Sequence, residues 1–307
     1  MDGQKEIRIV TWIELLQARG AFAFSIESAK KELPAYSEIA LKRALSRLSE
    51  KGKIISVYKG YYLILPPQYA LKGILPPSLF LDAFFQFLKR PYYVSLLNAA
   101  AYHGALHQQP QEYYVMTNFP TMRATQKKGL KINYVSIDKI PEKLLERRKT
   151  EAGYLTISNP MLTATDLVQF ERRIGGLNRA ATVLFELMEV LKPSDFNEDI
   201  LAHSAVTTLQ RLGYLLEFAC SNIELANALY KAMGKNKSRL FRIPLKASAQ
   251  TKGFSSDNRW KVIVNTEIDW EYLTQRKDLK FYKETYYNDY KASIGKHPIW
   301  YGRYFKG

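Results

Sequence analysis

The chain has 307 residues, of which 47% are hydrophobic, so it is long enough for two or three domains with real cores. Its 45 Lys and Arg against 29 Asp and Glu give a formal net charge of +16, which favours polyanionic partners such as DNA or RNA. The excess is +5 over residues 1–75, +2 over residues 76–200 and +9 over residues 201–307. Both ends of the chain are therefore expected to face polyanions.

Nothing in the sequence indicates export or membrane insertion. No run approaches the roughly 20 apolar residues that a membrane span needs, and no apolar segment follows the charged start of the chain. The single cysteine, Cys220, excludes an internal disulfide, and its apolar neighbours predict a buried thiol. We therefore expect a cytoplasmic protein with no membrane partner.

The first 70 residues predict three helices followed by a β-hairpin. The helices are expected over residues 7–20, 25–33 and 37–52, and the strands over 54–58 and 61–65, joined at Lys59-Gly60. Leu41, Leu45 and Leu48 give the third helix its apolar face. Three helices and a hairpin in this order are typical of a winged helix-turn-helix.

The polar face of the third helix and the hairpin tip predict contacts with DNA. A recognition helix needs an apolar face for docking and a polar face for the major groove, where arginines contact guanine edges or phosphates. The predicted DNA-binding residues are Ser37, Lys42, Arg43, Ser46 and Arg47 on the helix, with Lys59 and Tyr61 on the wing. The alternative is a protein-docking module whose basic face is simply solvated.

The rest of the chain predicts a mixed body, and hence an α+β fold. Prolines at 66–67 and 76–77 bracket a linker. Helices are expected over 78–89, 95–105, 162–170, 178–191, 203–220 and 223–233, and strands over 112–117, 131–137, 153–158, 239–245 and 259–265. The predicted division is a winged helix over 1–70, a mixed α/β domain over 78–200 and a basic α+β part over 201–307.

The C-terminal part combines basic and aromatic residues. Its possible contacts with nucleic acid or with a protein partner are Arg239, Arg242, Lys246 and Lys252. Residues 269–307 are rich in Tyr and Lys, which suits stacking on single strands, although an amphipathic helix that packs its tyrosines on the body is the preferred interpretation.

No pattern predicts catalysis, a metal or a cofactor. His103 and His107 have the i, i+4 spacing of metal ligands, but no third ligand is evident and Gly104 lies between them. Arg172 and Arg173 suit either phosphate contact or a solvated helix end. The sequence lacks a phosphate-binding GxxxxGK[ST] loop and the GxSxG, HExxH and HRD motifs. We expect neither an enzyme nor a metalloprotein.

The segments YYVSLLNAAAYHGALHQQPQEYYVMT, YLTISNPMLTATDLVQFERRIGGLNRAATVLFELME and LQRLGYLLEFA, followed by RWKVIVN, resemble the AbiEi family of antitoxins. Within SNPMLTATDLV, only Pro160, Leu162, Ala164 and Asp166 keep the family pattern. The resemblance implies a type IV toxin–antitoxin system in which an N-terminal domain represses its own operon. The larger C-terminal part is implied to counteract a nucleotidyltransferase-type toxin, functionally and not necessarily by direct contact. The tail beyond residue 269 lies outside the resemblance.

One absent motif bears on the choice between the alternative functions. The hallmark of such a toxin, a Gly-Ser pair followed by Asp-x-Asp, is absent from the sequence, which favours antitoxin over toxin. A transcriptional regulator outside any toxin–antitoxin system, with a ligand- or partner-sensing middle domain, remains the leading alternative. An RNA-processing enzyme is a third.

Overall fold

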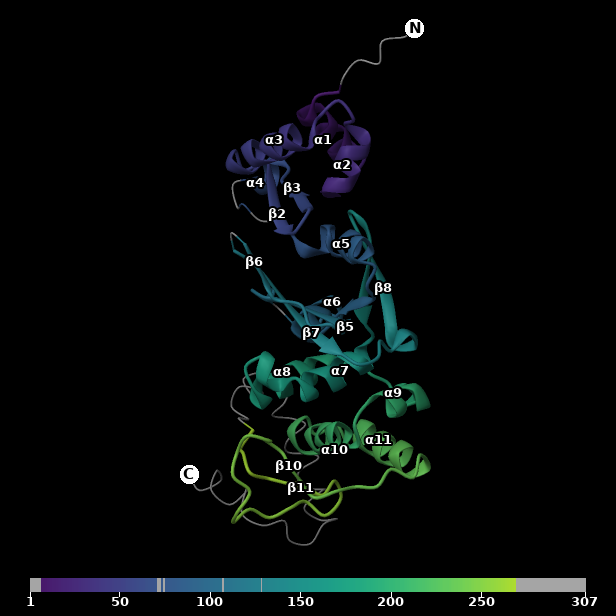
Figure 1. The fold of residues 1–307 in the computed structure, drawn as a ribbon. Helices are drawn as coiled ribbons and strands as arrows, with labels where there is room; N and C mark the ends of the chain where they lie inside the picture. The colour runs from purple at the N-terminus through teal and green to yellow at the C-terminus, as the bar shows by residue number, and fades with distance from the viewer. Residues whose placement is uncertain (1–6, 71–72, 74, 107, 128, 269–307) are drawn as a thin grey trace.

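The computed structural model describes residues 7–70, 73, 75–106, 108–127 and 129–268. Figure 1 shows an elongated stack of layers in chain order. Three helices and a small sheet form one end, a six-stranded sheet lies in the middle, and a helical layer with a two-stranded sheet forms the other end. The fold is mixed α and β, as the sequence predicts. The predicted roles of the tail 269–307 and of His107 concern residues outside those described.

The N-terminal unit contains the three predicted helices and the hairpin. Its elements are α1 (Ile9–Ala18), β1 (Ala23–Ser25), α2 (Ile26–Glu32), α3 (Glu38–Glu50), β2 (Ile54–Tyr58) and β3 (Tyr61–Ile64). The strands form an antiparallel sheet in the order β1-β3-β2, in which β1 was not expected from the sequence. Ser25 begins α2 through a reciprocal capping box with Ser28. Trp12, Phe24 and the three leucines of α3 share one core.

The central sheet has the strand order β6-β7-β5-β4-β9-β8. Its strands are β4 (Tyr92–Val94), β5 (Tyr113–Asn118), β6 (Thr125–Lys127), β7 (Leu130–Ile137), β8 (Leu145–Thr150) and β9 (Gly153–Ser158). The pairs β5/β7 and β4/β9 are parallel, and the other pairs are antiparallel. β4, β6 and β8 were not predicted, because two are only three residues long and the six residues of β8 read LERRKT, which lacks the alternation of a half-buried strand.

Both faces of this sheet are covered, by two different cores. Successive side chains of a strand point to opposite faces, so Val94 and Val115 pack on α5 (Leu81–Leu88), whereas Tyr93 and Met116 pack on the other side. That other side is covered by α6 (Leu96–Tyr102), α7 (Pro160–Gln169) and α8 (Leu177–Leu187).

The core around α5 continues into the N-terminal hairpin. Val57 and Leu63 of the hairpin belong to the same hydrophobic cluster as Phe84 of α5. The predicted linker contributes to it through Leu75, and Leu65 at the end of the predicted hairpin is also buried there. Short helical turns α4 (Pro67–Ala70) and η1 (Pro77–Leu79) lie along this connection. The predicted domain boundary near residue 70 therefore runs beside a shared core.

The last layer contains α9 (Glu198–His203), α10 (Val206–Tyr214), the π-helical turn η5 (Leu215–Ala219) and α11 (Ile223–Lys235). The single helix expected over 203–220 is therefore divided, because the chain is extended at Ser204 and Ala205. Both strands expected after α11 form, but β10 (Ile243–Pro244) and β11 (Val262–Ile263) are each only two residues long. Cys220 is buried, as expected, and burial raises the pKa of its thiol.

Candidate nucleic-acid interface

Helix α3 presents a polar, basic face to solvent. The Ser37 side chain begins the helix by accepting a hydrogen bond from the Ala40 amide at 3.2 Å. Leu41, Leu45 and Leu48 are buried in the N-terminal core. The exposed residues on the remaining faces include all the predicted helix contacts, namely Ser37, Lys42, Arg43, Ser46 and Arg47. The structure thus brings these five residues together on one accessible helix.

The charged side chains of this helix are not equally free to contact an external anion. Glu38 pairs with Lys42 at 2.9 Å and with Lys30 of α2 at 3.3 Å, and hydrogen bonds from these lysines lower the pKa of its carboxyl. The Ser46 hydroxyl donates to Glu50 at 3.1 Å. Within the described part of the chain, no ion pair involves Arg43 or Arg47. These two arginines are therefore the cations of α3 best placed to meet an external anion.

Ile39 is a further candidate that the sequence reasoning missed. It lies one turn before Arg43 and is 66% exposed, which is unusual for a large aliphatic side chain. Its position outside the i, i+3, i+4, i+7 pattern of the buried leucines is the signal that would have shown it. An exposed apolar group one turn before an arginine suits contact with the methyl group of thymine.

The hairpin β2–β3 differs from the predicted wing. Its two-residue turn is closed by Gly60 at φ +74°, and the Gly60 carbonyl accepts a hydrogen bond from the Ile26 amide at 2.8 Å. Lys59 is exposed at the tip. Tyr61 is only 3% exposed, with its ring centroid 5.1 Å from that of Phe84 and 4.9 Å from that of Phe87. The prediction that Tyr61 contacts DNA is wrong, because α5 covers this side chain.

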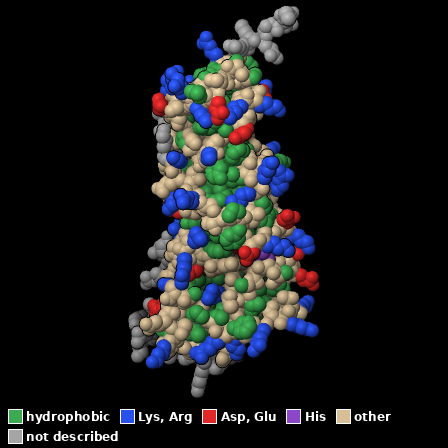
Figure 2. Space-filling view, viewed as in Figure 1, with side chains coloured by type: hydrophobic (Ala, Val, Ile, Leu, Met, Phe, Trp, Pro, Cys, Tyr) green, Lys and Arg blue, Asp and Glu red, His purple; other side chains and the backbone are tan. Residues whose placement is uncertain are grey.

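The second predicted basic site lies at the opposite end of the molecule. Arg239, Arg242, Lys246 and Lys252 are all exposed, in the segments around β10. Figure 1 places β10 and β11 far from α3, so the two predicted sites do not form one surface. Arg239 lies over the ring of Phe241, 5.5 Å from its centroid, and Phe241 is itself 49% exposed. Figure 2 shows Lys and Arg side chains along the whole visible face.

The central domain contains a buried polar network instead of an exposed site. The carboxylate of Asp166 in α7 accepts hydrogen bonds from the Ser95 hydroxyl at 2.6 Å and the Tyr93 hydroxyl at 3.2 Å. Burial raises the pKa of Asp166 to about 7, and the two hydroxyl donors oppose that rise. Asp166 therefore joins α7 to the end of β4, which explains why a carboxylate occupies the buried face of this helix.

Both ring nitrogens of His103 are engaged by other groups of the protein. Its Nε2 lies 2.8 Å from the Ser158 carbonyl, and its Nδ1 lies 3.3 Å from Arg148. Burial lowers the pKa of His103. Among the described residues, no three His, Cys, Asp or Glu side chains gather closely enough to hold a metal ion.

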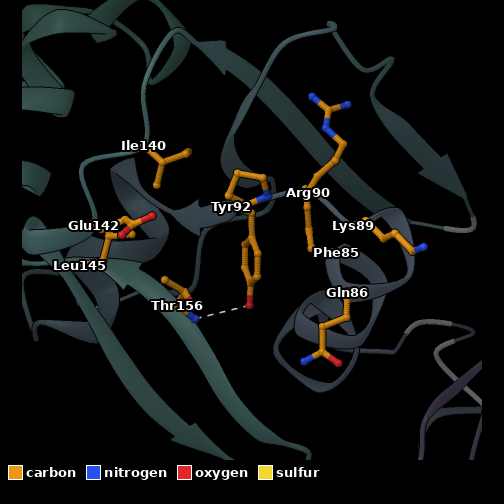
Figure 3. Close-up of a pocket in the computed structure, with 10 residues that line it drawn as sticks. Phe85, Gln86, Lys89, Arg90, Tyr92, Ile140, Glu142, Leu145 and Thr156 are labelled. Atoms are coloured by element: carbon orange, nitrogen blue, oxygen red, sulfur yellow. Dashed lines mark hydrogen bonds between the residues drawn. The ribbon is translucent and has the colours of Figure 1, made fainter.

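A shallow pocket lies between α5 and the sheet (Figure 3). Its volume is about 400 Å³, and Tyr92 forms its centre. The Tyr92 hydroxyl is engaged by Asp82 at 2.9 Å and by the Thr156 amide at 3.4 Å. Figure 3 shows the charged ends of Lys89 and Arg90 pointing away from the Tyr92 ring. The pocket therefore offers a ligand few free polar groups.

Residues 93–218, which span the central sheet and most of the helical layer, match the family model of the AbiEi antitoxin C-terminal domain. The chain carries an AbiEi antitoxin domain. This match confirms the expected family and supports an antitoxin role in a toxin–antitoxin system, which implies a toxin partner. The AbiEi domain contains the Asp166 network and helices α6, α7 and α8, which cover the second face of the sheet.

The comparison with solved structures extends beyond the AbiEi domain. The crystal structure of the RV2827C protein from Mycobacterium tuberculosis superposes with a TM-score of 0.61 at 17% sequence identity. The alignment covers 83% of this chain and 92% of that chain, so most of the fold is shared. No curated protein sequence matches the chain. In the part that the structure describes, no helix is both long and apolar enough to cross a bilayer.

Proposed function

We propose that this chain is a cytoplasmic type IV antitoxin that also represses its own operon, with its N-terminal unit acting as a winged helix on promoter DNA. The AbiEi domain supports the antitoxin role. The single observation that carries the DNA-binding role is the exposed face of α3, where Arg43 and Arg47 stand without an ion-pair partner in the described chain, on a helix held by three buried leucines.

The chemistry of α3 suits the major groove. A guanidinium donates two hydrogen bonds to the O6 and N7 atoms of guanine, so Arg43 and Arg47 are the proposed base-reading residues. Lys42, Ser46 and the start of the helix at Ser37 are the proposed phosphate contacts, together with Lys59 at the hairpin tip. We expect a promoter with inverted repeats, because paired recognition helices read such sites.

The second partner in this proposal is a cognate toxin of the nucleotidyltransferase type. In the type IV scheme that the family resemblance implies, neutralisation is functional and needs no stable complex. The exposed Arg239, Arg242, Lys246 and Lys252 are proposed to contact DNA flanks or the RNA on which such a toxin acts. A regulator that senses a ligand in the pocket around Tyr92 is less well supported, because the charged ends of Lys89 and Arg90 point away from the Tyr92 ring.

A gel-shift titration tests the DNA-binding half. The intact protein is titrated against its own promoter and against scrambled DNA of equal length, at physiological salt. We expect tighter binding to the promoter, which Arg43→Ala with Arg47→Ala abolishes. Arg8→Ala with Arg19→Ala is the matched control, since it removes two exposed cations at the ends of α1. Equal binding to both DNAs would show that net charge alone attracts DNA, and the repressor role would fail.

A toxin co-expression assay tests the antitoxin half separately. The Arg43→Ala, Arg47→Ala protein should still restore growth of cells that express the toxin, because α3 lies outside the AbiEi domain. Loss of rescue at unchanged protein level would mean that antitoxicity depends on DNA binding. Failure of the unmutated protein to rescue would refute the antitoxin role itself.

A further inference from the structure

A second, deeper cavity lies between the AbiEi helices and the segment around β10. Its volume is about 500 Å³, which is within the range of small-ligand sites. Its walls come from the end of α7, the helical turn η3 (Glu171–Arg173), α10 and residues 245–247. The cavity therefore forms only where segments far apart in the sequence meet.

Three arginines line this cavity. Arg172 and Arg173 come from η3, and Arg211 comes from α10. Gly175 and Gly176, at φ +101° and +100°, allow the chain to turn from η3 into α8 and leave η3 at the cavity edge. The Arg211 Nε donates to the Pro244 carbonyl at 3.0 Å, which holds the guanidinium in place. Arg211 is half-buried, and burial lowers its pKa, but a guanidinium keeps its charge in proteins.

The charge of the cavity is positive. Glu171 is the one carboxylate among its lining residues, and the Arg172 Nε lies a long 3.8 Å from it. Three arginines and one carboxylate therefore line the cavity. The remaining lining residues are mainly apolar, including Phe170, Leu245 and Ala247.

We infer that this cavity binds a nucleoside phosphate, with the phosphate on Arg172, Arg173 and Arg211 and the base against the apolar wall at Phe170 and Leu245. The planar fork of a guanidinium matches phosphate oxygens, and clustered arginines recognise phosphate strongly. A nucleoside base can pack on the apolar wall beside the cations. A simple anion such as phosphate has no apolar group to place there. The volume suits one nucleotide, either free or at the end of an RNA strand. This inference is independent of the proposed DNA contacts of α3.

Isothermal titration calorimetry on the intact chain tests the inference. The probes are adenosine 5′-monophosphate, inorganic phosphate, and a short single-stranded RNA with either a 5′-phosphate or a 5′-hydroxyl. We expect adenosine monophosphate to bind with a Kd below about 1 mM and more tightly than phosphate. A preference for the 5′-phosphorylated RNA over the free nucleotide would identify a strand end as the ligand, and the reverse order would identify the free nucleotide.

Two variants and a matched control connect the binding to the cavity. Arg173→Gln and Arg211→Lys should each weaken adenosine monophosphate binding about tenfold, which is the scale of a charge-assisted hydrogen bond. Arg179→Gln is the control, because Arg179 is an exposed arginine of α8 that does not line the cavity. Thermal unfolding without ligand shows whether each variant is folded.

Two outcomes would overturn the inference. The first is no heat of binding with any of the probes up to about 10 mM. The second is an equal loss of affinity in Arg179→Gln and Arg173→Gln, which would mean that general surface charge attracts the nucleotide.

Discussion

Helix α3 and the hairpin β2–β3 were both expected to contact DNA, yet the structure leaves only one of them largely free. α3 buries its leucines in a single core and keeps its polar residues exposed. The hairpin lies between two cores: Ile54 and Ile64 belong to the N-terminal core, whereas Ile55 and Leu63 belong to the core around α5.

The difference follows from the geometry of the two elements. A helix packed on one core has one buried stripe, so its periodicity identifies the exposed face. Successive side chains of a strand point in opposite directions, and the sequence does not say whether one or both faces are covered. Helix α5 covers the second face of this hairpin. The expected wing therefore packs between two layers of the molecule, and Lys59 at its tip stays exposed.

The largest expected effect distinguishes buried from exposed hairpin residues. Tyr61→Ala should lower the free energy of unfolding by about 3 kcal/mol, because it leaves a cavity beside Phe84 and Phe87. Tyr58→Ala, on the same hairpin but 45% exposed, should cost less than about 1 kcal/mol. Urea unfolding measures both values. Equal values would contradict the burial of the hairpin under α5.

The next effect concerns α3, where substitutions should weaken DNA binding and leave the free energy of unfolding nearly unchanged. Arg43→Ala and Arg47→Ala should each weaken promoter binding by about 1–3 kcal/mol if they read bases. Each should change the free energy of unfolding by less than about 0.5 kcal/mol, because both side chains are exposed. Gel shifts and urea unfolding on the same preparations separate the two effects. Unchanged affinity in both variants would refute the assignment of α3 as the recognition helix.

A smaller effect is expected at the far end of the molecule. Substituting Gln at Arg239, Arg242, Lys246 and Lys252 should reduce binding to RNA, to scrambled DNA and to the promoter, while the ratio of promoter affinity to scrambled-DNA affinity changes by less than about threefold. The reason is that these residues lie away from α3. Substitution is preferable to truncation near residue 200, because Leu212 and Trp260 belong to the main core. A large, promoter-specific loss would place sequence recognition at this end.

The smallest effect is expected at the hairpin tip. Lys59→Ala should weaken promoter binding less than tenfold and reduce the slope of log affinity against log salt by about 1, as for a single phosphate contact. Salt titrations of promoter binding give this slope. An unchanged slope would show that Lys59 does not meet DNA and that α3 acts without the hairpin.

How much of the fold could be predicted from the sequence depends on the same difference between helices and strands. The helical pattern of α3 located the helix and its exposed residues, since a long periodic segment has a clear signal. Strands β4 and β6 gave no comparable signal, because each is only three residues long and forms through pairing with distant strands. The expected strand over 239–245 shortened to two residues, because β10 pairs with β11 alone.

The sequence by itself determined the charge of the two ends, the polar face of α3, the buried thiol of Cys220 and the resemblance to the AbiEi antitoxins. These features depend on composition, local periodicity or patterns along the chain. The tertiary structure alone decided that Tyr61 is buried, that Asp166 joins α7 to β4, and that Arg211 lines the same cavity as the arginines of η3. It also explains Gly213 in the last turn of α10, where any Cβ would overlap the ring of Trp260. Each of these facts arises from contacts between residues far apart in the sequence, which local patterns do not record.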